Sequence, residues 1–271
     1  MIKFLAKGIL RDKNRSLLPI IVVSLGVLLT VFLSGWVTGV FGDMIDMNAR
    51  FTTGHVKIMT RAYAENRDQL PNDLALLEID ELKEKLQNDY PGMQWVDRIY
   101  FGGLLDVPDE KGETRAQAPA SGQAVDLLSP DSKEAERMNI EQSIISGRLP
   151  RNRGEALISD EFANRFDVAP GDEVTVFSST MYGSMAFKNF TVSGTVRFGT
   201  TMLDRGAVII DIRDAREAFN MDNAAGEVLG YFEEGKYLKE KAEAVKNSFN
   251  EKYSDEEDEF SPLMLTLGDQ E

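Results

Sequence analysis

The feature that most constrains this chain is an uninterrupted run of 27 uncharged residues from Ser16 to Gly42. At about 1.5 Å per residue, a helix of this length would extend roughly 40 Å, against about 30 Å for the hydrocarbon layer of a bilayer. All 75 charged residues of the 271-residue chain lie outside the run. We therefore expect one transmembrane helix over residues 17–42, with Pro19 in its first turn, followed by a water-exposed body.

The charges on the two sides of this run are unequal. Residues 1–16 carry a net charge of +4, so the rest of the chain carries −19 to give the total of −15. An excess of Lys and Arg before a span predicts a cytoplasmic N-terminus, and hence an extracytoplasmic body. Apolar and basic residues alternate at helical spacing over residues 1–16, which favours an amphipathic elbow on the cytoplasmic leaflet. The acidic body excludes nucleic acid as an expected partner.

The apolar run has two interpretations, a retained anchor and a cleaved signal peptide. A signal peptide has an apolar core of about 7–15 residues that ends at a small-x-small site, so the length of this run favours the anchor. Gly35 and Gly39 have the small-xxx-small spacing that lets a second helix approach closely, although such glycines also tolerate lipid. With Trp36 and Met44, they are our candidates for helix packing or substrate contact.

The body mixes strand and helix patterns without a regular βαβ repeat. We expect an α+β domain with a mainly antiparallel sheet and helices on one face. Within it, we predict a helix over residues 72–88 capped by Asp73, and a hairpin of strands 186–192 and 194–198. The expected organisation is a cytoplasmic elbow (1–16), a transmembrane helix (17–42), a helical stalk (43–53), the extracytoplasmic domain (54–260) and a segment returning toward a second membrane helix (261–271).

The sequence offers little catalytic chemistry. It has no cysteine and a single histidine, His55, which excludes thiolate metal sites and disulfides. Walker A, GxGxxG, HExxH and EF-hand patterns are absent, so we expect no catalytic residue, no metal and no cofactor in this chain. His55 begins a predicted strand, where a hydrogen-bonding role is the ordinary interpretation and a metal or catalytic role the alternative. The acidic run Asp255–Glu259 is interpreted as a solvated surface.

The segment from Ile145 to Phe177 has glycine, proline and acidic residues at a recognisable spacing. With the basic elbow, the first helix and the sequence TTGHVKIMTRAYAE, it resembles the FtsX-like/MacB-type ABC transporter permeases, including the lipoprotein-releasing Lol-type relatives. The usual Leu-Ala pair of that family is only approximated by Phe162 and Ala163. The residues at the family's spacing, expected to be structural, are Gly147, Pro150, Glu155, Ile158, Gly171, Asp172 and Val174.

The resemblance implies a MacB-like periplasmic core domain that follows the first of four membrane helices in the bacterial inner membrane. Since only one span is present in this sequence, we expect it to be part of a longer permease. Its implied partners are a separate ABC ATPase that binds the ATP, a second permease copy or paralogue, membrane lipid, and a lipoprotein or other exported substrate. The alternative function is a single-pass anchored binding or sensor module.

Overall fold

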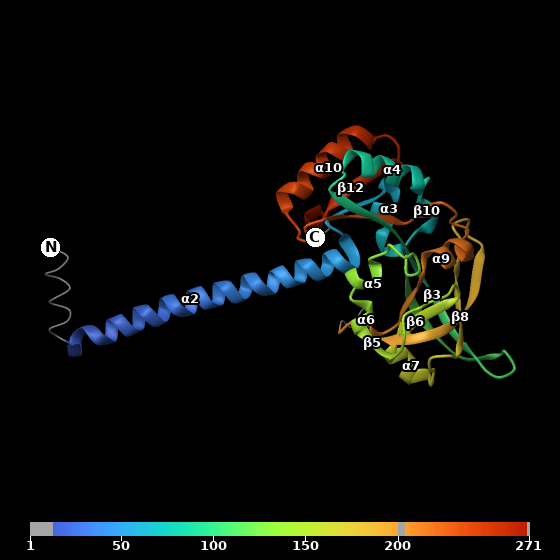
Figure 1. Cartoon of the computed structure of the whole chain (residues 1–271), viewed down its shortest axis with the longest axis horizontal. Helices are drawn as coiled ribbons and strands as arrows, with labels where there is room; N and C mark the ends of the chain where they lie inside the picture. Colours follow the sequence, from blue (N-terminus) through green and yellow to red (C-terminus); the bar gives the residue numbers. More distant parts are fainter. Residues whose placement is uncertain (1–12, 200–203, 270–271) are drawn as a thin grey trace. The chain divides into compact units, whose positions relative to one another are not determined.

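The computed structural model describes residues 13–199 and 204–269 (Figure 1). The chain divides into two compact units, Met1–Asn48 and Ala49–Glu271, which we describe separately. We call the second unit the head. Most of the expected elbow, residues 1–12, lies outside the described residues.

The first unit contains one long helix, α2, from Lys13 to Asn48. By length and composition, the helical stretch Leu17–Thr53 could cross a membrane. Pro19 lies inside α2 instead of in its first turn, because the helix begins earlier than the apolar run. The missing N–H of this proline therefore removes one backbone hydrogen bond from the helix.

The head is organised around a large mixed sheet. One part has four antiparallel strands in the order β12, β1, β11 and β3. The first half of β3 pairs with β11, from Met93 to Arg98, and its second half continues into the other part of the sheet. The bounds of these strands are β1 Val56–Thr60, β3 Met93–Pro108, β11 Glu227–Phe232 and β12 Pro262–Thr266.

The other part of the sheet closes on itself. From Ile99 onward β3 pairs with β4, and the pairings continue through β9, β6, β8 and β7 before β7 returns to β3. We call this closed circuit the strand ring. Its β4–β9 and β6–β8 pairs are parallel, and the others are antiparallel. The remaining bounds are β4 Thr114–Val125, β6 Glu155–Ser159, β7 Glu173–Ser179, β8 Met185–Val196, β9 Ala207–Asp211, β5 Ile144–Gly147 beside β8, and the small pair β2 Leu76–Leu77 with β10 Ala224–Ala225.

Short helices connect these strands. Helix α4 packs on β3, and α10 packs on β12 and β1 (Figure 1). Buried side chains form a large core and a smaller second core; the latter contains Val125, Met138, Ile140, Leu157, Val196 and Ile209. The helices are α3 Arg61–Asn66, α4 Ile79–Asp89, α5 Glu134–Arg137, α6 Ile140–Ser143, α7 Asp160–Phe166, α9 Ile212–Phe219 and α10 Lys239–Tyr253.

The predicted helix over residues 72–88 starts later than expected. Asn72–Leu74 is only a 3-10 turn, and the next residues pair with β10 before α4 begins at Ile79. Asp73 is therefore not the cap. Instead the side-chain oxygen of Asn223, from a distant segment, accepts a hydrogen bond from the backbone N–H of Asp80 at 3.0 Å.

The predicted hairpin across Ser193 and Gly194 is wrong, because β8 is one continuous strand through both residues. Gly194 does not form a turn; it allows β5 to approach β8 closely. A Cβ atom there would lie 2.8 Å from the carbonyl oxygen of Ser146 on β5. The missing side chain lets β5 lie directly against β8.

The segment predicted to return toward a second membrane helix, residues 261–271, contains a strand of the head. Within residues 261–271, Pro262–Thr266 forms β12, which pairs antiparallel with β1. The predicted stalk over 43–53 is divided between α2, which ends at Asn48, and a π-helical turn over Ala49–Thr53.

Candidate functional site

The candidate site is the π-helical turn Ala49–Thr53, which belongs to the head and directly follows α2 in the chain. The last carbonyls of a helix lack intrahelical partners and form the negative end of its dipole. In the turn, the backbone N–H of Gly54 donates to the carbonyl of Ala49 at 2.9 Å. Side chains from β3, β4 and β11 donate hydrogen bonds to the carbonyls of Ala49, Arg50 and Phe51.

Arg98 is the central residue of the site. Its side chain is 0% exposed, and its guanidinium donates to the carbonyl oxygens of Phe51 at 2.8 Å and Arg50 at 3.0 Å. The Nε atom donates to the carboxylate of Glu134 at 2.7 Å. One arginine therefore links two carbonyls of the helical turn to Glu134 of α5.

Three further side chains complete this arrangement. The hydroxyl of Tyr231 donates to the carbonyl of Ala49 at 3.1 Å, and that of Tyr100 donates to the carbonyl of Phe51 at 3.1 Å. The amide of Gln123 also donates to the Phe51 carbonyl, at 3.3 Å. We call the group the anchor cluster; it comprises Arg98, Tyr100, Gln123, Glu134 and Tyr231.

The electrostatics keep these donors protonated. Burial on its own would lower the pKa of Arg98, but the charge of Glu134, the nearby Tyr231 and Tyr100 and the hydrogen bond to Glu134 together outweigh it, so the net pKa is raised. Burial raises the pKa of Tyr231 to about 12 and that of Tyr100 well above its usual range. The anchor cluster therefore retains its hydrogen bonds to the turn throughout the physiological pH range.

The side chain of Phe51 adds an apolar attachment. It packs against the second core, where its ring lies 5.2 Å from that of Phe198 in an edge-to-face arrangement. The turn is thus held through both its backbone and an aromatic side chain. Such a double attachment resists displacement in more than one direction.

The position of Arg98 in the fold explains how these groups meet. Arg98 pairs with Glu227 of β11, whereas the next residue, Ile99, pairs with Ala124 of β4. Arg98 therefore lies where β3 passes from the four-stranded sheet into the strand ring. Our sequence interpretation missed it, although an arginine within the mainly apolar strand MQWVDRIYF was the available signal.

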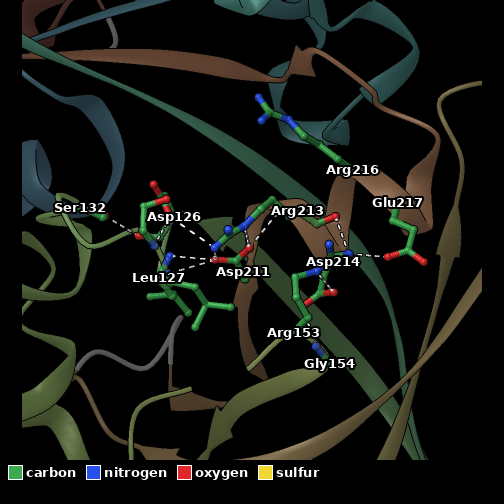
Figure 2. A network of polar contacts seen from close by, with 12 residues as sticks. Asp126, Leu127, Ser132, Arg153, Gly154, Asp211, Arg213, Asp214, Arg216 and Glu217 are labelled. Carbon is green, nitrogen blue, oxygen red and sulfur yellow. Dashed lines mark hydrogen bonds and ion pairs between the residues drawn. The ribbon is translucent and has the colours of Figure 1, made fainter. Parts of the chain in front are cut away.

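A second polar network holds the loop that follows β4 (Figure 2). The buried carboxylate of Asp211 accepts hydrogen bonds from the backbone N–H groups of Leu127 and Leu128, at 3.1 and 3.2 Å. It also pairs with Arg213 at 2.8 Å. On the next turn of α9, Asp214 accepts from Arg153 at 2.7 Å. This network fixes the loop that leads to Glu134 of the anchor cluster.

The residues predicted for helix packing remain on α2, outside the head. Gly35 and Gly39 are one turn apart, and no other described atom lies within 4 Å of a Cβ built at either position. Trp36 is 62% and Met44 47% exposed. Their role as a contact for a second helix stays a prediction.

His55 has a hydrogen-bonding role in the structure. It is 3% exposed, and its Nδ1 accepts the backbone N–H of Phe232 at 2.9 Å. Among residues 13–199 and 204–269, no group of three or more His, Asp or Glu side chains could hold a metal ion.

Comparison with known proteins addresses the fold. A family profile described as the MacB-like periplasmic core domain matches residues 16–247. The chain belongs to the MacB-like periplasmic core domain family. The structure of the periplasmic region of MacB from Actinobacillus actinomycetemcomitans is similar, with a TM-score of 0.50 and 10% sequence identity over 81% of this chain and 92% of that one. A comparison with curated protein sequences finds no match.

Membership of the MacB-like family confirms the resemblance drawn from the sequence. It also confirms the fold class, an α+β domain preceded by one apolar helix. The family indicates a non-catalytic component of an ABC transporter permease, anchored in a membrane by its helix and associated with a separate ATPase and a second permease subunit. The similar solved structure supports the fold alone.

The structure places the residues at the MacB-like spacing in turns, in buried positions and in one hydrogen-bonded cluster. Gly147 ends β5 with a φ of +81°, and Gly171 has a φ of +105°. Asp172 accepts the backbone N–H of Ala169 at 2.8 Å and so closes the turn before β7. The other members of this set are Pro150, Ile158 and Val174, which are buried, and Glu155, which forms a hydrogen-bonded cluster.

Glu155 gives the MacB-like motif a measurable pH dependence. Its carboxylate accepts hydrogen bonds from Arg148 at 2.7 and 2.8 Å and from the backbone N–H of Arg151 at 2.8 Å. These donors, Arg148 first, lower the pKa of Glu155 from 4.5 to about 2. Because the pKa is lowered in the folded state, the stabilisation is present above pH 4.5 and is lost as the pH falls toward 2.

Replacing this carboxylate tests the assignment. Glu155→Gln is expected to lower the free energy of unfolding by about 1–2 kcal/mol at neutral pH, because a charged acceptor is lost. Urea unfolding of both proteins over a pH series should show the difference shrinking below pH 4.5. Glu173→Gln, at an exposed position, is the control and should cost little. A loss that stays constant down to the lowest pH would contradict the ionic assignment.

Proposed function

We propose that this chain is a transmembrane subunit of an ABC transporter permease in a bacterial inner membrane, with a cytoplasmic N-terminus and the head outside the cytoplasm. ATP is hydrolysed by a separate ATPase chain, and this chain itself carries no cofactor. A second copy or a paralogue completes the permease. The head movements driven by ATP release a lipoprotein or export another substrate, in contact with membrane lipid.

The anchor cluster is the observation that carries this proposal. A permease that moves an outer domain needs a helix end that cannot slip against that domain. Ala49 follows Asn48 of α2 through a peptide bond, and the carbonyls of Ala49, Arg50 and Phe51 are held by buried donors. A displacement along the helix would therefore reach the head through the turn. A simple tether would need no such attachment.

Purification from native membranes tests the function. The chain, tagged and expressed in its own host, should be recovered in mild detergent with an ATPase that contains a Walker A motif, and the complex should hydrolyse ATP. Substitution of the Walker A lysine in that ATPase should abolish the hydrolysis while the subunits remain together. Recovery with partners that lack any nucleotide-binding motif, or without hydrolysis, would favour the anchored sensor instead.

Substitution of Gly39 tests the proposed helix contact. Gly39→Leu is expected to reduce recovery of the second permease subunit and ATP hydrolysis by about tenfold, because a leucine prevents close approach of two helices. Val37→Leu, which lies on another face of the helix, is the matched control and should leave both unchanged. Circular dichroism should show the head equally folded in both variants. Normal assembly and hydrolysis in Gly39→Leu would remove the assigned role of the glycines.

A further inference from the structure

A groove of about 410 Å³ lies in the head and shares one residue, Glu134, with the anchor cluster. One side is lined by the first half of β3, and another by the loop and α5 that follow β4. Glu134 of the anchor cluster and its partner Arg137 also line the groove. The lining also includes Trp95, Asp97, Asp131, Lys133 and Glu233.

The edge of β3 in this groove has unused backbone groups. The carbonyl of Gly230 accepts the N–H of His55, so Gly230 faces β1, and its neighbours in β11 face β3. The residues of β3 that point toward β11 are therefore Gln94, Val96 and Arg98. By alternation, the backbone groups of Trp95 and Asp97 point to the opposite edge, where pairing with β4 begins only at Ile99. No hydrogen bond to those groups exists within the described part of the chain.

The indole of Trp95 reports on this edge of the groove. Trp95 is 8% exposed and lines the groove, and its Nε1 is buried with no hydrogen-bond partner among the described residues. A segment that binds at the backbone of Trp95 should therefore change the surroundings of the indole.

The charge of the groove selects the kind of peptide. Asp97 is already paired, with Lys83 at 2.5 Å and Arg216 at 2.7 Å. Over the whole lining there are three cationic and five carboxylate side chains, a net charge of −2. The exposed carboxylates of Asp131 and Glu233 form no ion pair within the residues that the structure describes. A cationic side chain is the complementary partner.

We propose that this groove binds an extended segment of a partner protein that bears lysine or arginine. The segment adds as a strand to the free edge of β3 at Trp95 and Asp97, with its cationic side chains toward Asp131 and Glu233. Strand addition derives its affinity from main-chain hydrogen bonds and its specificity from alternate side chains. Because Glu134 contacts both the groove and Arg98, the occupant lies beside the anchor cluster.

Fluorescence of the full chain in detergent tests the proposal directly. The sequence has two tryptophans, so Trp36→Phe leaves Trp95 as the only indole. The probe is a capped octapeptide of alternating threonine and lysine, and we expect saturable changes in Trp95 emission that calorimetry reproduces. The peptide of alternating threonine and glutamate, and a lysine peptide methylated on alternate backbone nitrogens, should bind at least about tenfold more weakly.

Charge reversal distinguishes binding in the groove from general electrostatic attraction of a cationic peptide to an acidic protein. Asp131→Lys combined with Glu233→Lys should weaken the lysine peptide by about tenfold. Glu110→Lys combined with Glu173→Lys makes the same change in net charge at exposed positions outside the groove and should leave binding almost unchanged. Absence of saturable binding, equal binding of the methylated peptide, or equal losses in the two double variants would overturn the proposal.

Discussion

Replacing Arg98 with methionine is expected to lower the free energy of unfolding of the head by about 3–5 kcal/mol, the usual cost of removing one partner of a buried ion pair. The substitution leaves the buried carboxylate of Glu134 with one ion-pair partner, Arg137, instead of two. It also removes donors from the carbonyls of Arg50 and Phe51. Urea unfolding of the full chain, followed by far-ultraviolet circular dichroism, measures the loss.

Two further variants distinguish this attachment from a general effect of removing an arginine. Arg115→Met changes an exposed arginine of β4, whose guanidinium donates to the carbonyl of Asp167, and should cost less than about 1 kcal/mol. Adding Glu134→Leu to Arg98→Met should recover part of the loss, because the buried carboxylate that has lost Arg98 is gone. Similar small losses for Arg98→Met and Arg115→Met would show that the anchor cluster contributes little to stability.

Gly147→Ala is expected to cost about 2–4 kcal/mol, measured by the same unfolding assay, because two penalties add at this position. The backbone has a φ of +81°, which an alanine adopts with strain. In addition, a Cβ atom would lie 2.3 Å from the carbonyl oxygen of Ser193 on β8. The contact is with backbone, so it cannot be relieved by a side-chain rotation.

Gly154→Ala separates the two penalties. Gly154 has a similar φ of +78°, but a Cβ built there meets no described atom within 4 Å. We therefore expect a loss of about 1–2 kcal/mol from backbone strain alone. The difference between the two variants measures the close approach of β5 and β8, and equal losses would mean that β5 moves aside at little cost.

Local patterns predicted much of the fold. The helix Asp160–Phe166 has its start signal in the local sequence, since Ser159 caps it by accepting the N–H of Phe162. Patterns failed where a distant segment decides the local structure. Asn223 caps α4, and β8 continues through Gly194, where β5 packs closely, although Ser193-Gly194 resembles a turn.

The candidate site was less predictable than the fold. The sequence predicted a helix that leaves the membrane and enters a folded domain, but it gave no indication of what holds the helix end. Arg98 lies 47 residues from Phe51 and 133 from Tyr231, so these contacts depend on how β3 and β11 pair. The closure of the strand ring likewise requires the pairing of β7 with β3. The alternation of apolar and polar residues within either strand does not indicate this pairing.

The uninterrupted course of β3 has a consequence for cooperativity. Met93–Pro108 is a single strand whose first half belongs to the four-stranded sheet and whose second half belongs to the strand ring. Unfolding of either half of the head would remove hydrogen-bonding partners from β3, the strand that both halves share. The two halves should therefore unfold together in a single transition, as one foldon instead of two subdomains joined by a linker.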